Sequence, residues 1–143
     1  MKIAVKKLHT DAVLPSLGSE YAAGADLYSV EEMTIAVGET KLVHTGLAME
    51  IPVGYGGFIF ARSGLATKRG LAPANKVGVI DADYRGEIMV ALHNHGSADQ
   101  TIEKGERVAQ LVVMPFLAAE YFESETLSDT ARGEGGFGSS GRK

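Results

Sequence analysis

The chain has 143 residues, enough for one domain that buries roughly two-thirds of its unfolded surface. It contains no cysteine, which excludes disulfides and thiolate metal sites, and its formal net charge of -4 argues against binding a nucleic-acid polymer, which depends on basic residues. The sequence shows neither a signal peptide nor a long apolar run, so we expect a cytoplasmic protein that does not bind membranes.

Short strands are predicted along most of the chain, because apolar residues recur with a period of two. Turn signals separate these stretches at roughly 8–12-residue spacing, and 18 of the residues are glycine. The side chains expected to face the core are Leu47, Met49 and Ile51, then Phe58 and Phe60, then Ile88, Val90 and Leu92. We therefore expect an all-β domain built as a sandwich, jelly roll or barrel.

Three further segments have a specific expected structure. Residues 54–57 are most simply a turn between strands. Residues 65–69, which follow Ser63 and Gly64, form the one short helix that we expect. Residues 107–122 contain Pro115, which would cost about 3 kcal/mol inside a helix, so we predict a strand that ends near a sheet edge.

The residues around Asp26 and Arg62 are the first candidates for a site. Asp26 lies beside a glycine turn at Gly24, where turn statistics favour a carboxylate that accepts hydrogen bonds from turn amides over a functional one. Arg62, Ser63 and Gly64 lie at a strand-to-helix junction, whose free amides favour an anion. Anion binding and simple helix capping explain this second group equally well.

Two later segments add an acid and an amide. Residues 78–87 run from an apolar strand into a hairpin turn, which explains Asp83 and Gly86 but leaves Asp81 without a structural role. Residues 105–110 continue from a turn into a strand that carries Gln110 among apolar neighbours. An inward glutamine amide needs hydrogen-bond partners, and a ligand is one candidate.

The tail at residues 131–143 can form neither regular structure nor a core, because five of its residues are glycine. Arg132 can pair with a phosphate and Phe137 can lie on a base, so the tail suits a flap that closes over a nucleotide bound elsewhere. A flexible terminus without function explains the same composition about equally well. We divide the chain into a β domain, residues 1–130, and this flexible glycine-rich flap, residues 131–143.

Five stretches occur in a fixed order: AGADL, RSGLA, GVIDADYRGE, GERVAQLVV and RGEGGFGSSG. Together they resemble the five ordered motifs of the homotrimeric dUTPase family, deoxyuridine 5′-triphosphate nucleotidohydrolases. The resemblance runs from about Ala23 to Gly141. The chain departs from the family at Ala61, where members usually have proline and which would loosen the approach to the phosphate loop, and at Ser140, where threonine is common.

The resemblance implies a jelly-roll homotrimer in which each site combines residues from all three subunits. The enzyme would hydrolyse dUTP to dUMP and pyrophosphate, keeping uracil out of DNA and supplying dUMP for thymidylate synthesis. Asp81 would be the general base that deprotonates a water attacking the α-phosphorus. Mg²⁺ would bridge the triphosphate, and Asp26 would hold its water shell from the second sphere.

The resemblance also implies how the phosphate chain is held. Arg62, Ser63 and Gln110 would bind it, with Ser63 near the bridging oxygen that leaves, where charge develops in the transition state. Arg132 would arrive with the tail as an arginine finger on the terminal phosphate.

The remaining implied contacts select the base and the sugar. Asn75 and the backbone of the hairpin at residues 75–89 would pair with the uracil edge, and Phe137 would cover the uracil. Tyr84 would pack on the deoxyribose and leave no space for a 2′-hydroxyl. The other predicted substrate contacts are Gly64, Gly78, Met89, Gly138 and Ser139.

Two alternatives from other classes remain at this point. A dCTP deaminase shares the fold, but it resembles the chain less at RSGLA and needs a different acid pair at the base. A jelly roll without catalytic activity, such as a structural subunit or a regulatory binder, would have no use for Asp81, Arg132 and Phe137 together. Release of ammonia from dCTP would identify the first, and absence of dUTP turnover with Mg²⁺ the second.

Overall fold

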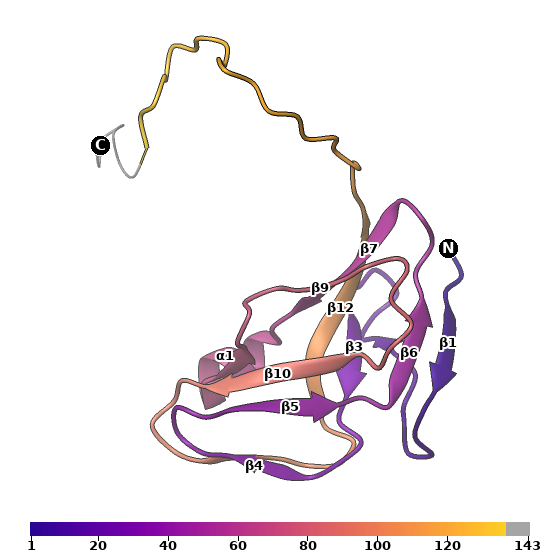
Figure 1. Cartoon of the computed structure of the whole chain (residues 1–143). Helices are drawn as coiled ribbons and strands as arrows, with labels where there is room; N and C mark the ends of the chain where they lie inside the picture. The colour runs from indigo at the N-terminus through magenta and orange to yellow at the C-terminus, as the bar shows by residue number, and fades with distance from the viewer. Residues whose placement is uncertain (137–143) are drawn as a thin grey trace.

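The structure, a computed structural model, describes residues 1–136. This part of the chain folds into short strands with one short helix at their side (Figure 1). No helix in it is long and apolar enough to cross a membrane. In chain order the elements are β1 (Ala4–Lys7), β2 (Ser16–Leu17), β3 (Ala25–Tyr28), β4 (Met33–Ile35), β5 (Thr40–His44), β6 (Leu47–Glu50), β7 (Tyr55–Phe60), α1 (Ser63–Arg69), β8 (Leu71–Pro73), β9 (Gly78–Ile80), β10 (Met89–Asn94), β11 (Gln100–Ile102) and β12 (Arg107–Pro115).

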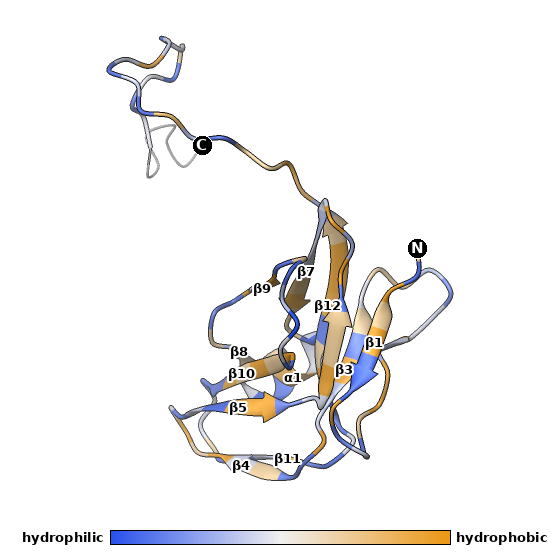
Figure 2. Ribbon diagram, turned by 45° about the vertical axis from the view of Figure 1, so that its right-hand side comes forward, coloured by the Kyte–Doolittle hydropathy of each residue, from blue (hydrophilic) through white to orange (hydrophobic). Residues whose placement is uncertain are grey.

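The strands form antiparallel sheets arranged as a jelly roll. The largest sheet has the order β2-β3-β12-β7-β9 and the next has the order β5-β10-β8, while β1 pairs with β6 and β4 with β11. Figure 2 shows β12, the central strand of the largest sheet, coloured as hydrophobic along much of its length. The predicted all-β jelly roll with one short helix is confirmed.

The core lies between the sheets and confirms the inward positions predicted for β6 and β10. Leu47 and Met49 of β6 and Ile51 just after it are buried, as is the intervening Ala48. The buried apolar side chains of β10 and the residue before it are Ile88, Val90 and Leu92. The predicted inward residues of both segments belong to one apolar cluster, so the two segments pack into the same core.

Strand β7 faces the core with the positions opposite to those predicted. Ile59 is buried, whereas Phe58 and Phe60 are only partly buried. Close packing at Gly57 fits this orientation, because a Cβ added there would lie 2.7 Å from the Ile51 side chain. Apolar residues occupy both faces of β7, so a period of two alone could not decide which face points inward.

The short helix and the turn before β7 both begin earlier than predicted. α1 begins at Ser63, which puts that residue in the first helical turn. The turn predicted at residues 54–57 lies between β6 and β7 but includes only Gly54 of those residues, because Tyr55 is already the first residue of β7. The Tyr55 N–H donates to the Pro52 carbonyl at 3.1 Å, so the turn closes where the strand begins.

The segment predicted as a hairpin at residues 75–89 instead connects two sheets. β9 pairs with β7, whereas β10 pairs with β5 and β8. The hairpin prediction is therefore wrong, because the two apolar stretches pair with distant strands rather than with each other. A cavity lies between β9 and β10.

Strand β12 ends at Pro115, so the strand predicted at residues 107–122 is correct only as far as that residue. Residues 116–136 contain no helix or strand and run away from the barrel in both views (Figures 1 and 2). They carry exposed apolar side chains, among them Leu117 and Tyr121. The predicted flap thus begins within an extended arm.

Candidate active site

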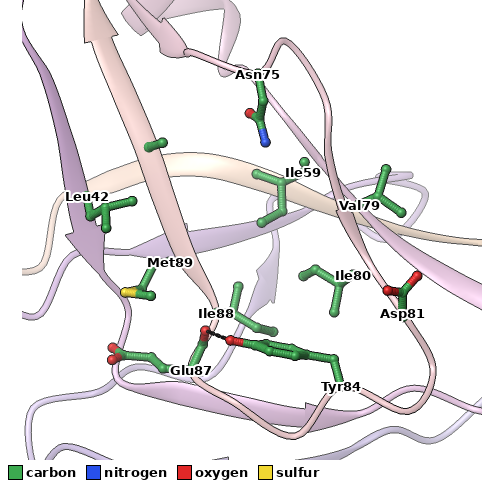
Figure 3. Close-up of a pocket in the computed structure, with 12 residues that line it drawn as sticks. Leu42, Ile59, Asn75, Val79, Ile80, Asp81, Tyr84, Glu87, Ile88 and Met89 are labelled. Atoms are coloured by element: carbon green, nitrogen blue, oxygen red, sulfur yellow. Dashed lines mark hydrogen bonds between the residues drawn. The ribbon is translucent and has the colours of Figure 1, made fainter.

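A cavity of about 290 Å³ opens between β9 and β10 (Figure 3). Its lining is largely apolar, with a small number of polar groups, which is the usual form of a small-molecule site. The residues predicted for the site that line it are Asn75, Gly78, Asp81, Tyr84 and Met89. The structure therefore brings the predicted base and the predicted nucleoside contacts of one chain together.

Tyr84 is held at this cavity by its own connecting segment. Its hydroxyl donates to the main-chain carbonyl of Glu87 at 2.9 Å, the bond drawn as a dashed line in Figure 3. A Cβ added at Gly86 would lie 2.4 Å from that hydroxyl oxygen, so glycine lets the tyrosine side chain lie close to the backbone. The orientation of the ring is thus set by residues 84–87.

Asp81 follows β9 directly and is exposed on the lining of the cavity. Its main-chain carbonyl accepts the Tyr84 N–H at 3.2 Å, which fixes the backbone at this position. Nothing in residues 1–136 forms an ion pair or hydrogen bond with its carboxylate. A carboxylate in this position can orient a water and accept its proton.

Glu87 forms another part of the wall and was missed in the sequence analysis. Its Oε1 accepts the Gly46 N–H at 2.8 Å, and its Oε2 lies 3.0 Å from His44 Nδ1. Burial raises the pKa of Glu87, but the hydrogen bonds from His44 and Gly46 outweigh it and hold that pKa below its ordinary value. The hydrogen bond to Glu87 raises the pKa of His44.

A second group, the Asp26 cluster, consists of Asp26, Arg62 and Arg107. Asp26 is buried in β3, where its Oδ1 accepts from Arg62 Nε at 3.0 Å and its Oδ2 from Arg107 Nη1 at 3.3 Å. The prediction that turn amides satisfy this carboxylate is wrong, because the two arginines do so. Arg107 was missed, although its motif was noted, because the sequence does not show that β12 pairs with β3.

Ser63 and Gly64 lie next to this cluster in the chain, in the first turn of α1. The N-cap is Arg62, and no side chain caps the helix, so simple capping by Ser63 is not its role. Both residues are exposed, and nothing lies within 4 Å of a Cβ added at Gly64. Buried Leu65 anchors the helix, which leaves this first turn open to a ligand.

Gln110 lies beside the Asp26 cluster because its strand pairs with the strand of Asp26. In β12 it pairs with Asp26 of β3 on one side and with Phe60 of β7 on the other. A Cβ added at Gly24 would lie 3.2 Å from Gln110 Cβ, so the glycine gives the glutamine room beside β3. The predicted phosphate contacts of one chain therefore lie near one another.

Asp81 and the Asp26 cluster lie level with different parts of β7. Asp26 is level with Phe60, whereas Asp81 follows Ile80, which pairs with Gly57. At about 3.3 Å per residue, the two carboxyl-bearing positions are separated by roughly 13 Å along the strand direction. Within residues 1–136 of one chain, the cavity with Asp81 and the Asp26 cluster are therefore two separate groups, here called half-sites.

Arg132 lies in the arm, away from both groups. Its Nε donates to the Gly135 carbonyl at 2.7 Å within its own turn. The other predicted residues of the tail, Phe137, Gly138 and Ser139, lie outside the described residues.

The comparisons with known proteins identify the family. The family model described as dUTPase matches residues 10–141. The chain belongs to the dUTPase family. The deoxyuridine 5′-triphosphate nucleotidohydrolase of Nautilia profundicola is 51% identical to it over 142 residues, which cover 99% of this chain and 100% of that protein. Membership of the dUTPase family, which the five motifs predicted, is therefore confirmed.

Solved structures of dUTPases share the fold over nearly the whole chain. The dUTPase of Staphylococcus bacteriophage 80alpha with dUPNHPP superposes with a TM-score of 0.92 at 32% identity and covers 98% of both chains. A mutant dUTPase from phage phi11 of S. aureus superposes with a TM-score of 0.82 at 26% identity, covering 88% of this chain and 98% of its own. That second structure shows the coordination of a structural Mg(II) ion.

Proposed function

We propose that this chain hydrolyses dUTP to dUMP and pyrophosphate by in-line attack of water on the α-phosphorus. The observation that carries the proposal is Asp81, an exposed carboxylate on the lining of a cavity that Tyr84 and Asn75 also line. It would orient the attacking water and take its proton, a contribution of typically 10²–10⁴-fold. The products give the protein a role in keeping uracil out of DNA and in supplying dUMP for thymidylate synthesis.

The cavity would bind the nucleoside. The Asn75 amide and the backbone near Gly78 would pair with the uracil edge. The two residues lie side by side, since Gly78 is buried and a Cβ added to it would lie 3.4 Å from Asn75 Nδ2. Cytosine presents the opposite donor and acceptor at its exocyclic position, and buried unmatched polar groups can reject such an analogue by 10⁴–10⁵-fold. Tyr84 would pack on the deoxyribose, and Met89 would line the same space.

The other half-site would hold the triphosphate. Arg62 has guanidinium N–H groups besides the Nε that it donates to Asp26, and the exposed Ser63 hydroxyl would lie near the leaving bridging oxygen. Gln110 would add an amide donor, and Gly64 would let the backbone approach closely. Donors aimed at developing charge stabilise the transition state more than the ground state.

Asp26 would hold a magnesium ion through water rather than directly. Within residues 1–136 no group of three or more acidic, histidine or cysteine side chains could hold a metal. Mg²⁺ prefers phosphate oxygens and its own waters to such a cage, and each oxygen of Asp26 can accept a second hydrogen bond besides the one from its arginine. When bound, the ion would neutralise charge on the phosphates.

Three copies of the chain would complete each site. The Asp26 and Asp81 positions are roughly 13 Å apart along the strand direction, and the arm, residues 116–136, runs away from the barrel (Figure 1). A homotrimer with shared sites would join half-sites from different subunits. Arg132 would then act as an arginine finger, and Phe137 with Gly138 and Ser139 would cover the base.

Pyrophosphate release measured across dUTP, UTP, dTTP and dCTP with Mg²⁺ tests the activity. We expect rapid release from dUTP alone. Ammonia release from dCTP would instead support a deaminase, and no turnover of any nucleotide would support a binding protein.

Reassortment of two inactive variants tests the shared site. Chains carrying Asp81→Asn are mixed equally with chains truncated before Arg132. If base and tail come from different subunits, roughly a quarter of the sites regain both on random assembly. No recovered activity, in trimers shown by mass spectrometry to be mixed, would mean that each chain serves its own site.

A further inference from the structure

Glu87 connects the cavity to the turn between β5 and β6. Its carboxylate accepts the Gly46 N–H at 2.8 Å and lies 3.0 Å from His44 Nδ1. The neighbouring backbone is held to the same turn, because the Ile88 N–H donates to the Leu47 carbonyl at 2.8 Å. Both the side chain of Glu87 and the backbone of the next residue are therefore hydrogen-bonded to the turn between β5 and β6.

The Tyr84 hydroxyl is bonded to the main chain of Glu87. It donates to the Glu87 main-chain carbonyl at 2.9 Å, on the cavity wall (Figure 3). The tyrosine is 43% exposed, so surrounding side chains enclose only part of it. The position of its ring thus depends on where the Glu87 carbonyl lies.

We propose that Glu87, held by His44 and the Gly46 amide, is a positioning residue that sets the place of the Tyr84 ring and thereby the preference for deoxyribose over ribose. The proposal rests on the proposed contact between Tyr84 and the sugar. Glu87 itself touches neither the reacting phosphorus nor the attacking water. Its carboxylate is suited to the task because a charged acceptor forms stronger hydrogen bonds than a neutral one.

The preference is measured as kcat/KM for dUTP divided by kcat/KM for UTP. The two nucleotides share the base and the triphosphate, so effects on the general base and on Mg²⁺ cancel in this ratio. Glu87→Ala should lower the ratio about tenfold, while kcat for dUTP changes less than about twofold. Glu87→Gln should restore most of the ratio, because the amide oxygen still accepts the Gly46 N–H.

Two further variants separate this role from general damage. Glu50→Ala is the matched control and should keep the parental ratio. Glu50, at the end of β6, lies 3.7 Å from Arg85, which belongs to the same connecting segment as Tyr84 and Glu87. Glu50 has no part in the link between Glu87 and Tyr84. Tyr84→Phe breaks the link from its other end and should also lower the ratio. Combining Tyr84→Phe with Glu87→Ala should lower it by less than the two separate effects together.

The outcomes distinguish the two proposals. A parental ratio in Glu87→Ala together with a lowered ratio in Tyr84→Ala would overturn the positioning role and leave the sugar contact intact. A parental ratio in Tyr84→Ala would overturn both. If Glu87→Ala does not fold, Tyr84→Phe decides, because a parental ratio there would show that the bond to the Glu87 carbonyl does not position the ring.

Discussion

Replacing Asp26 by asparagine should destabilise the fold, because its carboxylate is buried between two arginines. It accepts from Arg62 at 3.0 Å and from Arg107 at 3.3 Å, and only 4% of the residue is exposed. A hydrogen bond to a charged group contributes about 1.5–3 kcal/mol, and the half-exposed Arg107 contributes less. Asparagine keeps one acceptor oxygen, so we expect the free energy of unfolding to fall by about 2 kcal/mol.

Thermal unfolding followed by circular dichroism measures this loss. With an unfolding entropy of about 2.1 cal/mol/K per residue, a chain of 143 residues loses about 7 °C in Tm for ~2 kcal/mol. Parent and variant are compared at one protein concentration, since the Tm of an oligomer depends on concentration. Arg107→Gln is the matched control, because it removes only the more exposed contact and should lower Tm by less than about 3 °C.

A Tm for Asp26→Asn within about 1 °C of the parent would refute this reasoning, since desolvation of the carboxylate would then cancel both arginine contacts. Equal losses for Asp26→Asn and Arg107→Gln would contradict the assignment of the larger share to Arg62.

The remaining predictions concern the base, the ion pair and one turn. Asp81→Asn should keep binding of a non-hydrolysable dUTP analogue, measured by calorimetry, but lower turnover at least about a hundredfold, and turnover within a few-fold of the parent would exclude Asp81 as the base. The stability that Glu87 contributes is present above its ordinary pKa of 4.5 and is lost as the pH falls through its lowered pKa. The stability that His44 contributes is present below its ordinary pKa of 6.5 and is lost as the pH rises through its raised pKa. The loss of Tm in His44→Ala should therefore be larger at about pH 6 than at about pH 9, and equal losses would contradict the charged pair. Gly46→Ala should lower the free energy of unfolding in urea by about 1–3 kcal/mol, because Gly46 has φ +64° and a Cβ would lie 2.7 Å from the His9 side chain; an unchanged midpoint would show that the turn adapts.

The sequence by itself determined the family and the class of fold. Five short motifs in order predicted the family, and the family model matches residues 10–141. The alternation at residues 47–51 and 88–92 predicted buried strands correctly, since burial of one face imposes a period of two whichever strand lies beside it. The family resemblance predicted Asn75, Gly78 and Asp81 as site residues, and all three line the cavity.

Only the tertiary structure decided which strands pair and which charged groups therefore meet. Asp26 and Arg107 are 81 positions apart, and His44 and Glu87 are 43 apart, so no local pattern joins either pair. The same limit explains two wrong predictions. The strands β9 and β10, close in sequence, were expected to form a hairpin but belong to different sheets, and the inward face of β7 was predicted wrongly. Residue types specify a period and a turn, but the packing of the whole core selects the partner strand and the face that it buries.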